Sequence, residues 1–405
     1  MRICHVITRL TLGGAQEDTV RTVKGLLRRG HEVRLLAGPA DGPVGEIYRE
    51  LEKAGRLVII SHLRRRIDPV ADLLAFLELW RYLQAHPCEV VHTHSSKAGI
   101  LGRWAARLAG VPLVVHTVHG YPFHRGQPWL VNCFYRLLER AAVPATDLLL
   151  AVSRTLAEEA RRWKLAPAGE VEVVPSAVDL EPFLAAGEAE RARVRAELGL
   201  RPEDLVLGSV GRLVPLKGHR FLLEAVKRLG ERRRGAVKAV IAGEGPCREE
   251  LDRQARRLGI EGQVLFLGLR SDVPALLAAV DVFVHTSLWE GLPRVVVEAL
   301  AAGRPVAAFA VDGVPEALGE GERGLLVEPE DVEGLCEAIE RLAGDVELRA
   351  RLVEAGRRWV VQRYRPEAMV ERIEELYREH LARRPGRFYG STRLVPNRSK
   401  SLSKE

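Results

Sequence analysis

The chain has 405 residues, of which 47% are hydrophobic and 28% are charged, and its formal net charge is +7. This composition is that of a globular protein of about two or three domains and excludes collagen-like, disordered and miniprotein classes. Five scattered cysteines without a Cys-x-x-Cys pair argue against a disulfide framework or a zinc knuckle and favour a cytoplasmic location. The chain opens on a strand-like segment rather than a secretory signal, and no apolar run approaches the roughly 20 residues of a membrane span.

In chain order, the first half contains short apolar segments without strict alternation, a pattern typical of buried parallel strands. These segments are Arg2–Thr8, His31–Ala37, Leu57–Ser61, Glu89–His94, Pro112–His119, Asp147–Ser153 and Val171–Val174. Amphipathic helical patterns separate them, and the first begins after Gly13 and Gly14 and ends at Gly30.

The second half repeats this alternation after a polar stretch near Glu181–Leu200, which we interpret as a helix. Its expected strands are Leu205–Val210, Val237–Ala242, Val264–Leu267, Val282–Thr286, Pro305–Ala310 and Gly324–Val327. Strands that alternate with helices predict an α/β fold with two doubly wound, Rossmann-like parallel sheets facing across a cleft. Ligands of such sheets bind beyond the carboxyl ends of the strands, so the residues after each strand are the candidates.

Two post-strand loops carry groups that could bind a diphosphate. Gly13 and Gly14 lie between a strand and a helix, where backbone amides can approach an anion, although such a turn is often only a turn. Arg212 and Lys217 stand five residues apart after the strand Leu205–Val210. A guanidinium fork and an ammonium in one loop can hold a diphosphate, and the alternative is a pair of surface cations.

A second group of candidates follows later strands. Gly243 opens a Gly-x-Gly turn that serves either loop packing or a nucleotide. Glu290 lies in a post-strand loop, and Glu298 is expected about two turns into the next helix, within Val-Val-Val-Glu-Ala-Leu. Such a carboxylate is costly to bury unless it accepts hydrogen bonds, which sugar or ribose hydroxyls would donate. Alternatively, Glu298 points to solvent or caps a neighbouring helix. Backbone amides from Gly291 onward add donors at a helix start.

Histidines cluster after the strands of the first half. They are His92, His94, His116, His119 and His124. A metal site is disfavoured because carboxylates are absent nearby, so contacts to a sugar or phosphate at the cleft rim are the preferred interpretation. A buried structural role stays open for His92 and His116, which fall inside strands. The chain has no Asp-x-Asp, Walker loop, Gly-x-Ser-x-Gly or His-Glu-x-x-His motif, which counts against NTPases, hydrolases and metalloproteases.

Together these motifs resemble the retaining glycosyltransferases of family 4, which have the GT-B fold. The motifs are Glu-x7-Glu at 290 and 298, G-R-L-V-P-L-K-G at 211–218, A-G-E-G-P at 242–246 and G-G-A-Q at 13–16. The resemblance covers about residues 2–380. The segments H-T-H-S-S-K-A-G and H-T-V-H-G-Y-P-F-H are similar to those of members that act in bacterial polysaccharide or glycolipid synthesis.

The resemblance implies an acceptor-side domain over 1–182 and a nucleotide-sugar-binding domain over 183–362. A last helix over 363–381 would cross back onto the first domain. Residues 382–405 form a basic tail whose composition predicts disorder.

The resemblance also implies residue roles. Catalytic roles fall on Arg212, Lys217, His119 and Glu290. The donor would be held by Gly13, Gly14, Gly243, Gly291, Leu292, Pro293 and Glu298. Within this set, Arg212 and Lys217 would bind the diphosphate, Glu298 the ribose, and His119 would lie near the reacting face of the sugar. One departure is Ser176-Ala177, where many relatives carry Asn-Gly, so any role of that turn is open.

The expected activity is retaining, metal-independent and cofactor-free hexosyl transfer. The donor would be a UDP- or GDP-sugar, and the acceptor a hydroxyl on a lipid-linked or polysaccharide precursor of the cell envelope. A catalytically silent nucleotide-sugar-binding scaffold and a GT-B sugar-nucleotide epimerase are the alternatives. The first 180 residues carry 24 Lys+Arg against 18 Asp+Glu, a net +6. With Arg64–Arg66, this excess suits peripheral docking at the anionic inner face of the plasma membrane. Nucleic acid is disfavoured because aromatics are not interleaved with the basic residues.

Overall fold

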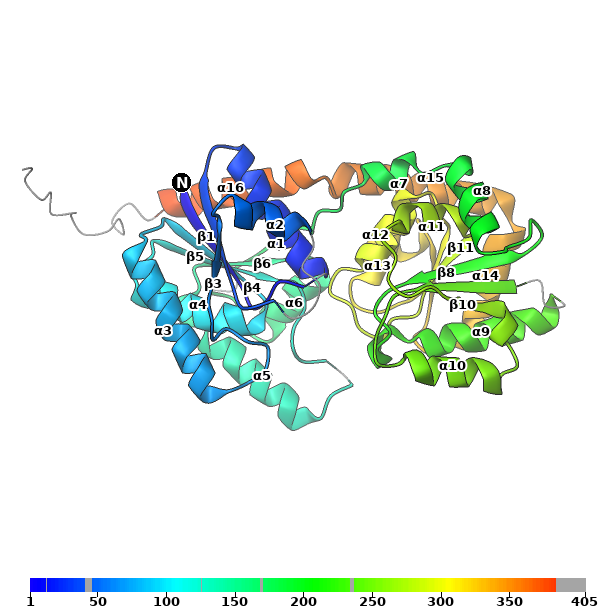
Figure 1. Cartoon of the computed structure of the whole chain (residues 1–405), viewed down its shortest axis with the longest axis horizontal. Helices are drawn as coiled ribbons and strands as arrows, with labels where there is room; N and C mark the ends of the chain where they lie inside the picture. The colour runs from blue at the N-terminus through cyan, green and yellow to red at the C-terminus, as the bar shows by residue number, and fades with distance from the viewer. Residues whose placement is uncertain (12, 41–45, 125, 168–169, 234–236, 384–405) are drawn as a thin grey trace, which may run out of the picture.

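The computed structural model describes residues 1–383 except 12, 41–45, 125, 168–169 and 234–236. It shows two parallel sheets with their helices, side by side along the long axis of the molecule (Figure 1). Each sheet has the doubly wound topology that the alternation of strands and helices predicts, so the expected α/β fold is confirmed. The predicted tail lies outside the described residues from 384 onward.

The first sheet has seven strands in the order β3-β2-β1-β4-β5-β6-β7. The strands are β1 Arg2–Ile7, β2 Glu32–Ala37, β3 Leu57–Ile59, β4 Val90–His94, β5 Leu113–Val118, β6 Leu148–Ala151 and β7 Val171–Val173. Its helices are α1 Gly14–Arg28, α2 Glu46–Lys53, α3 Pro69–Ala85, α4 Ser96–Leu108, α5 Trp129–Ala141 and α6 Arg154–Arg162. The strand order reverses between β1 and β4, where the crevice of a doubly wound sheet opens.

The second sheet has six strands in the order β10-β9-β8-β11-β12-β13. The strands are β8 Leu205–Val210, β9 Val237–Ala242, β10 Val264–Phe266, β11 Val282–His285, β12 Val306–Phe309 and β13 Leu325–Val327. The helices with it are α9 His219–Arg232, α10 Arg248–Arg257, α11 Val273–Ala279, α12 Arg294–Ala301, α13 Val314–Leu318, α14 Val332–Gly344 and α15 Val346–Arg363. The order reverses between β8 and β11, so both crevices lie at carboxyl strand ends.

Each observed strand lies inside one of the expected strand segments. Residues of β4, β5, β6, β11 and β12 are buried throughout, which is why they stand out as apolar runs. The polar stretch Glu181–Leu200 is helical, but it forms two helices, α7 Glu181–Ala185 and α8 Glu188–Glu197. The break falls at Gly187, whose extended backbone starts the second helix.

The last helix, α16 Pro366–Ala382, returns from the second sheet to the first and packs on α1 (Figure 1). Glu374 pairs with Arg29 and lies 2.9 Å from His31, while Tyr377 is buried against the first sheet. The boundary at 182/183 stays a prediction. None of the helices in the described part of the chain is both long and apolar enough to cross a membrane.

Candidate active site at the facing strand ends

The loops after β5 and β11 bring the two sheets into close contact. A Cβ at Gly291 would lie 2.2 Å from the carbonyl oxygen of His119, so only glycine allows this approach. Leu292 packs against apolar side chains of both halves of the chain. His119, Gly291 and Leu292 therefore lie where the carboxyl ends of the two sheets face each other, as ligand sites of such sheets require.

Lys217 and Glu290 form the charged centre on the second sheet's side. Lys217 ends a short 3-10 turn, and its Nζ donates to Glu290 Oε1. His285, the last residue of β11, places Nε2 3.1 Å from the same oxygen. Burial alone would raise the pKa of Glu290, but Lys217 and His285 hold it below the usual range. Glu290 is thus an ionised, tightly held carboxylate, suited to orienting a ligand.

Arg212 and Gly243 occupy the neighbouring loops after β8 and β9. The Arg212 side chain is exposed, and the described residues provide no ionic partner for it. A Cβ at Gly243 would lie only 1.9 Å from the Gly211 carbonyl oxygen. The glycine therefore lets the two loops close on each other, which supports the packing interpretation of this turn. Arg212 remains accessible to an anion and lies in the same loop region after β8 as Lys217.

Glu298 lies just over one turn into α12, so the expectation of about two turns is wrong. The helix starts late because Pro293, with φ −77° and ψ 74°, is its non-helical N-cap. Arg294 Nη2 lies 3.8 Å from Glu298 Oε1 and 2.9 Å from Glu17 Oε2. Burial raises the pKa of Glu298 to about 7. Since Glu17 belongs to α1, Arg294 links the two halves of the molecule at this carboxylate.

Gly13 and Gly14 start α1 on the opposite wall of the cleft. Gly13 is the N-cap and Gly14 the first helical residue. A Cβ at Gly14 would lie 3.1 Å from Arg294 Cδ. The amino end of α1 therefore faces the start of α12, the helix that carries Arg294 and Glu298, and its backbone donors favour an anion there.

His119 is held from two sides. Its Nε2 lies 3.1 Å from His94 Nδ1, and His94 Nε2 lies 2.9 Å from His5 Nδ1. On the other side, His119 Nδ1 lies 3.8 Å from Asp18 Oδ2. Burial lowers the pKa of all three histidines, to about 3 for His5, so each ring carries one proton.

Asp18 sets the direction of this histidine chain. A carboxylate near His119 Nδ1 favours the proton on that nitrogen, which leaves Nε2 to accept from His94. The same polarity makes His5 the terminal donor. Its buried Nε2 has no hydrogen-bond partner among the described residues and is then an unprotonated acceptor rather than an unpaired N–H. Reversing the chain would bury an unpaired N–H and face a lone pair toward the carboxylate. The chain therefore holds His119 in one tautomer and orientation.

Two other histidines of the cluster, His92 and His116, are structural, whereas the His124 ring lies 5.8 Å from that of Trp289. His92 bonds Tyr377 at 2.5 Å and Thr117 at 2.6 Å, and His116 bonds Thr93 at 2.9 Å, all in the buried sheet. His5, His92 and His94 have ligand atoms within 4.8 Å of one another, as a metal site could. However, the ring nitrogens of His92 and His94 are already hydrogen-bonded, so this cluster fits a hydrogen-bond network better than a metal centre.

The sequence analysis did not identify three residues of the site. Arg294 could have been found, because it stands four residues before Glu298, the spacing of a helical ion pair. Asp18 gives no such signal: Ser176 Oγ and the Ala177 amide donate to its carboxylate, each at 3.1 Å. The unusual Ser176-Ala177 turn thus positions Asp18. Trp289 precedes Glu290 and lines the cavity beside His119.

Two adjacent cavities lie near His119 and share part of their walls. The inner cavity, of about 240 Å³, contains His119 and Trp289 in its wall. The outer groove, of about 650 Å³, lies between α3, α4 and α5. Both are lined by Ser95, Ser96, Pro122 and Glu139. A ligand can therefore extend from the reacting centre to the surface of the first domain.

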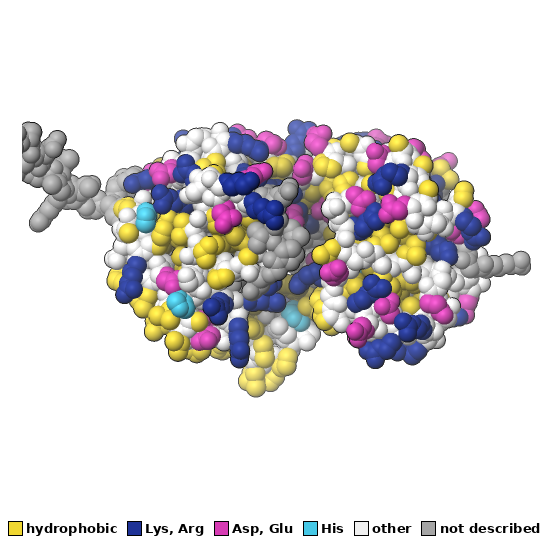
Figure 2. Space-filling view, viewed as in Figure 1, with side chains coloured by type: hydrophobic (Ala, Val, Ile, Leu, Met, Phe, Trp, Pro, Cys, Tyr) yellow, Lys and Arg dark blue, Asp and Glu magenta, His cyan; other side chains and the backbone are white. Residues whose placement is uncertain are grey.

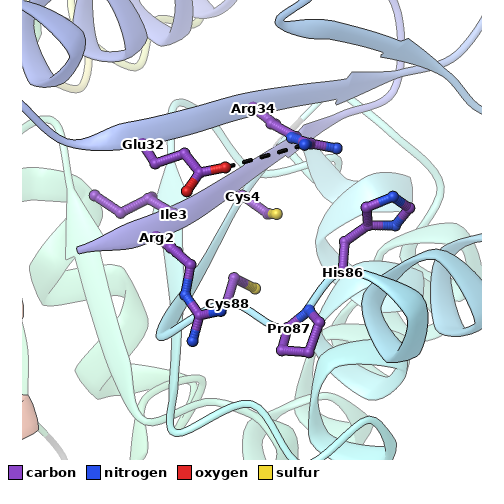
Figure 3. Close-up of a pocket in the computed structure, with 8 residues that line it drawn as sticks. All are labelled: Arg2, Ile3, Cys4, Glu32, Arg34, His86, Pro87 and Cys88. Carbon is purple, nitrogen blue, oxygen red and sulfur yellow. Dashed lines mark ion pairs between the residues drawn. The ribbon is translucent and has the colours of Figure 1, made fainter. Parts of the chain in front are cut away.

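A third cavity, of about 180 Å³, lies at the opposite, amino-terminal edge of the first sheet (Figure 3). Its walls carry Cys4, Cys88 and the ion pair of Glu32 with Arg34. The Cys88 thiol and Arg34 lower the pKa of Cys4 despite its burial. All five cysteines are free. Because it lies at the far ends of the strands, this cavity is not part of the candidate site.

Comparisons with known proteins agree with this architecture. Residues 13–177 match the family model of the glycosyl transferase 4-like domain, and residues 190–359 match that of the glycosyl transferases group 1. The chain is 31% identical over 379 residues to the UDP-Gal:alpha-D-GlcNAc-diphosphoundecaprenol alpha-1,3-galactosyltransferase of Escherichia coli, covering 93% of this chain and 96% of that protein. It is 31% identical over 376 residues to the lipopolysaccharide core biosynthesis glycosyltransferase LpsE of Rhizobium meliloti, covering 92% and 97%. Among solved structures, Anabaena HepE in complex with UDP superposes with a TM-score of 0.78 at 23% identity, covering 94% and 100%.

Proposed function

The chain belongs to the group 1, family 4 glycosyltransferases, which have the GT-B fold, and on that premise we propose retaining, metal-independent transfer of a hexosyl group from a nucleoside diphosphate sugar to a hydroxyl. The observation that carries the proposal is one cluster at the facing strand ends. It joins Lys217 to Glu290 by an ion pair and packs Gly291, the next residue, against His119. Arg212 lies in the loop between β8 and Lys217, and Glu298 lies in α12, the helix that follows Glu290.

The cations serve the hardest step, which is departure of the diphosphate as positive charge develops on the sugar. Arg212 and Lys217 stabilise the negative charge that accumulates on the leaving group. Lys217 is balanced by Glu290 before the donor binds, so the donor phosphate meets a cation already fixed in place. Removing one such donor typically costs about 2.7–4 kcal/mol of transition-state stabilisation.

The stereochemical proposal follows from the state of Glu290. Retention by double displacement needs a free carboxylate nucleophile. Glu290 instead shares one oxygen with Lys217 and His285 and is stabilised as an anion. We therefore assign it to the donor sugar's hydroxyls. Transfer then proceeds on one face of the sugar, where the departing phosphate takes the acceptor's proton and no metal is needed.

Donor and acceptor classes are drawn from the relatives. HepE was solved with UDP, and the Escherichia coli relative is named for UDP-Gal and a diphosphoundecaprenol-linked sugar. LpsE is named for lipopolysaccharide core biosynthesis. We assign a UDP-sugar donor and a lipid-linked acceptor of cell-envelope synthesis, used at the inner face of the plasma membrane. The exposed basic segment Arg64–Arg66 supports docking at an anionic surface.

The test is a panel of UDP-, GDP- and ADP-sugars added to the purified protein with and without EDTA. A ligand that binds the folded state raises its thermal stability. We expect one nucleotide class to stabilise the protein in EDTA, and Lys217→Ala to reduce transfer by about 10²–10³-fold. Lys227→Ala, a matched lysine of the same domain on α9, should retain activity.

Near-normal transfer by a folded Lys217→Ala protein would refute the diphosphate role. Stabilisation without release of nucleoside diphosphate would favour the silent scaffold, and isomerised nucleotide sugar would favour the epimerase.

A further inference from the structure

Asp312 has a backbone conformation that is unusual for a residue with a side chain. It follows β12, and its φ of 44° lies in the left-handed region. Aspartate tolerates this region better than most residues, but the conformation still costs free energy and persists only where neighbouring contacts hold it. Such residues cluster at binding and active sites. The contacts of Asp312 therefore indicate what its conformation serves.

The side chain of Asp312 holds the backbone of Glu290. Its Oδ2 accepts a hydrogen bond from the Glu290 N–H at 2.7 Å. A Cβ at the next residue, Gly313, would lie 2.5 Å from the Gly291 carbonyl oxygen, so the loops after β11 and β12 are in direct contact. An ammonium and an imidazole fix the carboxylate of Glu290, and Asp312 fixes its main chain.

The segment that begins at Asp312 is also held by the first domain. Thr155 Oγ1, on α6, donates to the Asp312 carbonyl oxygen at 3.1 Å. Glu316, in α13, accepts through Oε2 from the N–H of Arg154, the first residue of α6, at 2.7 Å. The unpaired amides at a helix start favour such a carboxylate.

These contacts depend on how the two domains sit against each other. Helices α6 and α13 lie on facing sides of the cleft (Figure 1), and on the face seen in Figure 2 the two domains form separate lobes that meet at a furrow. Both hydrogen bonds join α6 of the first domain to the segment after β12 of the second. They are therefore present only while the domains are docked.

Asp312 thus connects the domain interface to the loop of Glu290. If α6 moves away, the Asp312 carbonyl loses the hydroxyl that holds it, and the strained backbone is free to relax. The carbonyl and the side chain share one Cα, so relaxation moves both and withdraws the acceptor from the Glu290 amide. Glu290 then keeps its ion pair but loses the support of its main chain.

We propose that Asp312 is a positioning residue, which holds Glu290 in its donor-sugar-binding pose only while α6 is docked on it. Sugar binding then depends on closure of the cleft, so the reacting bond is held in place only when the first domain covers it. This inference rests on the proposed transferase function, in which Glu290 contacts the donor sugar, and deepens it. Asp312 acts through Glu290 and is assigned no contact with the donor.

Hydrogen exchange of the Glu290 amide tests the contact in the full-length protein without any ligand. The rate is measured by mass spectrometry with fragmentation that resolves single amides. Asp312→Gly should accelerate exchange by about tenfold, because glycine adopts the same backbone conformation at no steric cost but removes the acceptor. Asp312→Asn keeps an oxygen acceptor and tolerates the left-handed region, so it should exchange like wild type.

The matched control is Glu330→Gly. Glu330 also has a positive φ, of 71°, and lies in the second domain. This substitution relieves the same kind of strain away from Glu290 and should leave the exchange rate of the Glu290 amide unchanged.

Thr155→Val tests the link to the first domain. It keeps the shape of the side chain and removes the hydroxyl, so the Glu290 amide should exchange faster although the substitution lies across the cleft. Thr155→Ser keeps the hydroxyl and should preserve the wild-type rate.

Calorimetry with UDP and UDP-galactose connects the contact to the donor sugar. Asp312→Gly should weaken UDP-galactose binding by about tenfold and leave UDP binding unchanged, because Glu290 is assigned to the sugar rather than to the nucleotide. Asp312→Asn should keep both affinities. A merely structural role of Asp312 would weaken both ligands alike.

The inference is overturned if the Glu290 amide exchanges at the wild-type rate in Asp312→Gly or in Thr155→Val. It is also overturned if Asp312→Gly lowers the affinities for UDP and UDP-galactose equally. If the exchange rates change as expected while the wild-type protein binds neither ligand, the donor assignment fails and the positioning of Glu290 by Asp312 stands.

Discussion

Replacing Glu298 with glutamine should change how the free energy of unfolding depends on pH. Because Glu298 is buried, the variant should gain stability relative to wild type as the pH rises. The folded-state pKa of Glu298 is about 7, against a reference value of 4.5. A raised pKa means that the folded protein favours the protonated carboxyl. Its contribution to stability is complete below pH 4.5 and is lost as the pH rises through 7.

The magnitude follows from the same two values. Each unit of difference corresponds to about 1.4 kcal/mol, so ionising Glu298 in the folded protein costs at most about 3 kcal/mol above pH 7. The side chain is 15% exposed, so solvent screening reduces this figure only modestly. Glutamine keeps the shape and hydrogen-bonding capacity but cannot ionise, and it therefore escapes the cost.

The assay is guanidinium unfolding of wild type and Glu298→Gln at fixed pH values between 4.5 and 8.5. Subtracting the two free energies of unfolding removes the contributions of groups that both proteins share. The advantage of the variant should grow by up to about 3 kcal/mol across this range and level off above pH 7. The exposed Glu337→Gln on α14 is the control and should give a flat difference. A flat curve for Glu298→Gln, or one that rises toward acid, would refute the buried-carboxylate reasoning.

Three further predictions concern the positioning of the site. His94→Phe should lower kcat and leave the donor Kd unchanged, because it removes the partner that orients His119. His94→Gln should restore part of the rate. A change in the donor Kd with an unchanged kcat would contradict this prediction. Gly291→Ala places a Cβ 2.2 Å from the His119 carbonyl and should cost about 10²-fold in transfer by holding the cleft open, visible as a larger radius of gyration in X-ray scattering. Arg103→Met leaves Glu139 buried and unpaired and should destabilise by about 3–5 kcal/mol in chemical unfolding, with much of the loss recovered in Arg103→Met/Glu139→Leu.

The strands were predictable because buried parallel strands read as continuous apolar runs. Leu148–Ala151 and Val282–His285 are buried at every position, so burial itself produces the signal. The meeting of the carboxyl ends of the two sheets was predictable from the topology, and these ends bring Lys217, Glu290 and His119 close together. Helix starts were less predictable, as Glu298 shows, because a local N-cap at Pro293 decides the first turn.

The contacts across the cleft could not be predicted from the sequence. Asp18 meets His119 only because β1 and β5 flank β4 and because the Ser176-Ala177 turn donates to its carboxylate. His5 joins His94 through the pairing of β1 with β4, which no local pattern reveals. Likewise, the pairing of Glu17 with Arg294 depends on how the two domains close. These features belong to tertiary packing rather than to periodicity.

The central claim is tested most directly by one transfer experiment. The protein is incubated with a labelled α-linked nucleotide sugar and a lipid diphosphate-linked monosaccharide in EDTA, and the linkage formed in the lipid extract is determined by NMR. We expect the label in the lipid fraction, through an α-linkage, at the same rate with and without the chelator. A β-linked product, or label recovered only as free sugar or isomerised nucleotide sugar, would contradict the account.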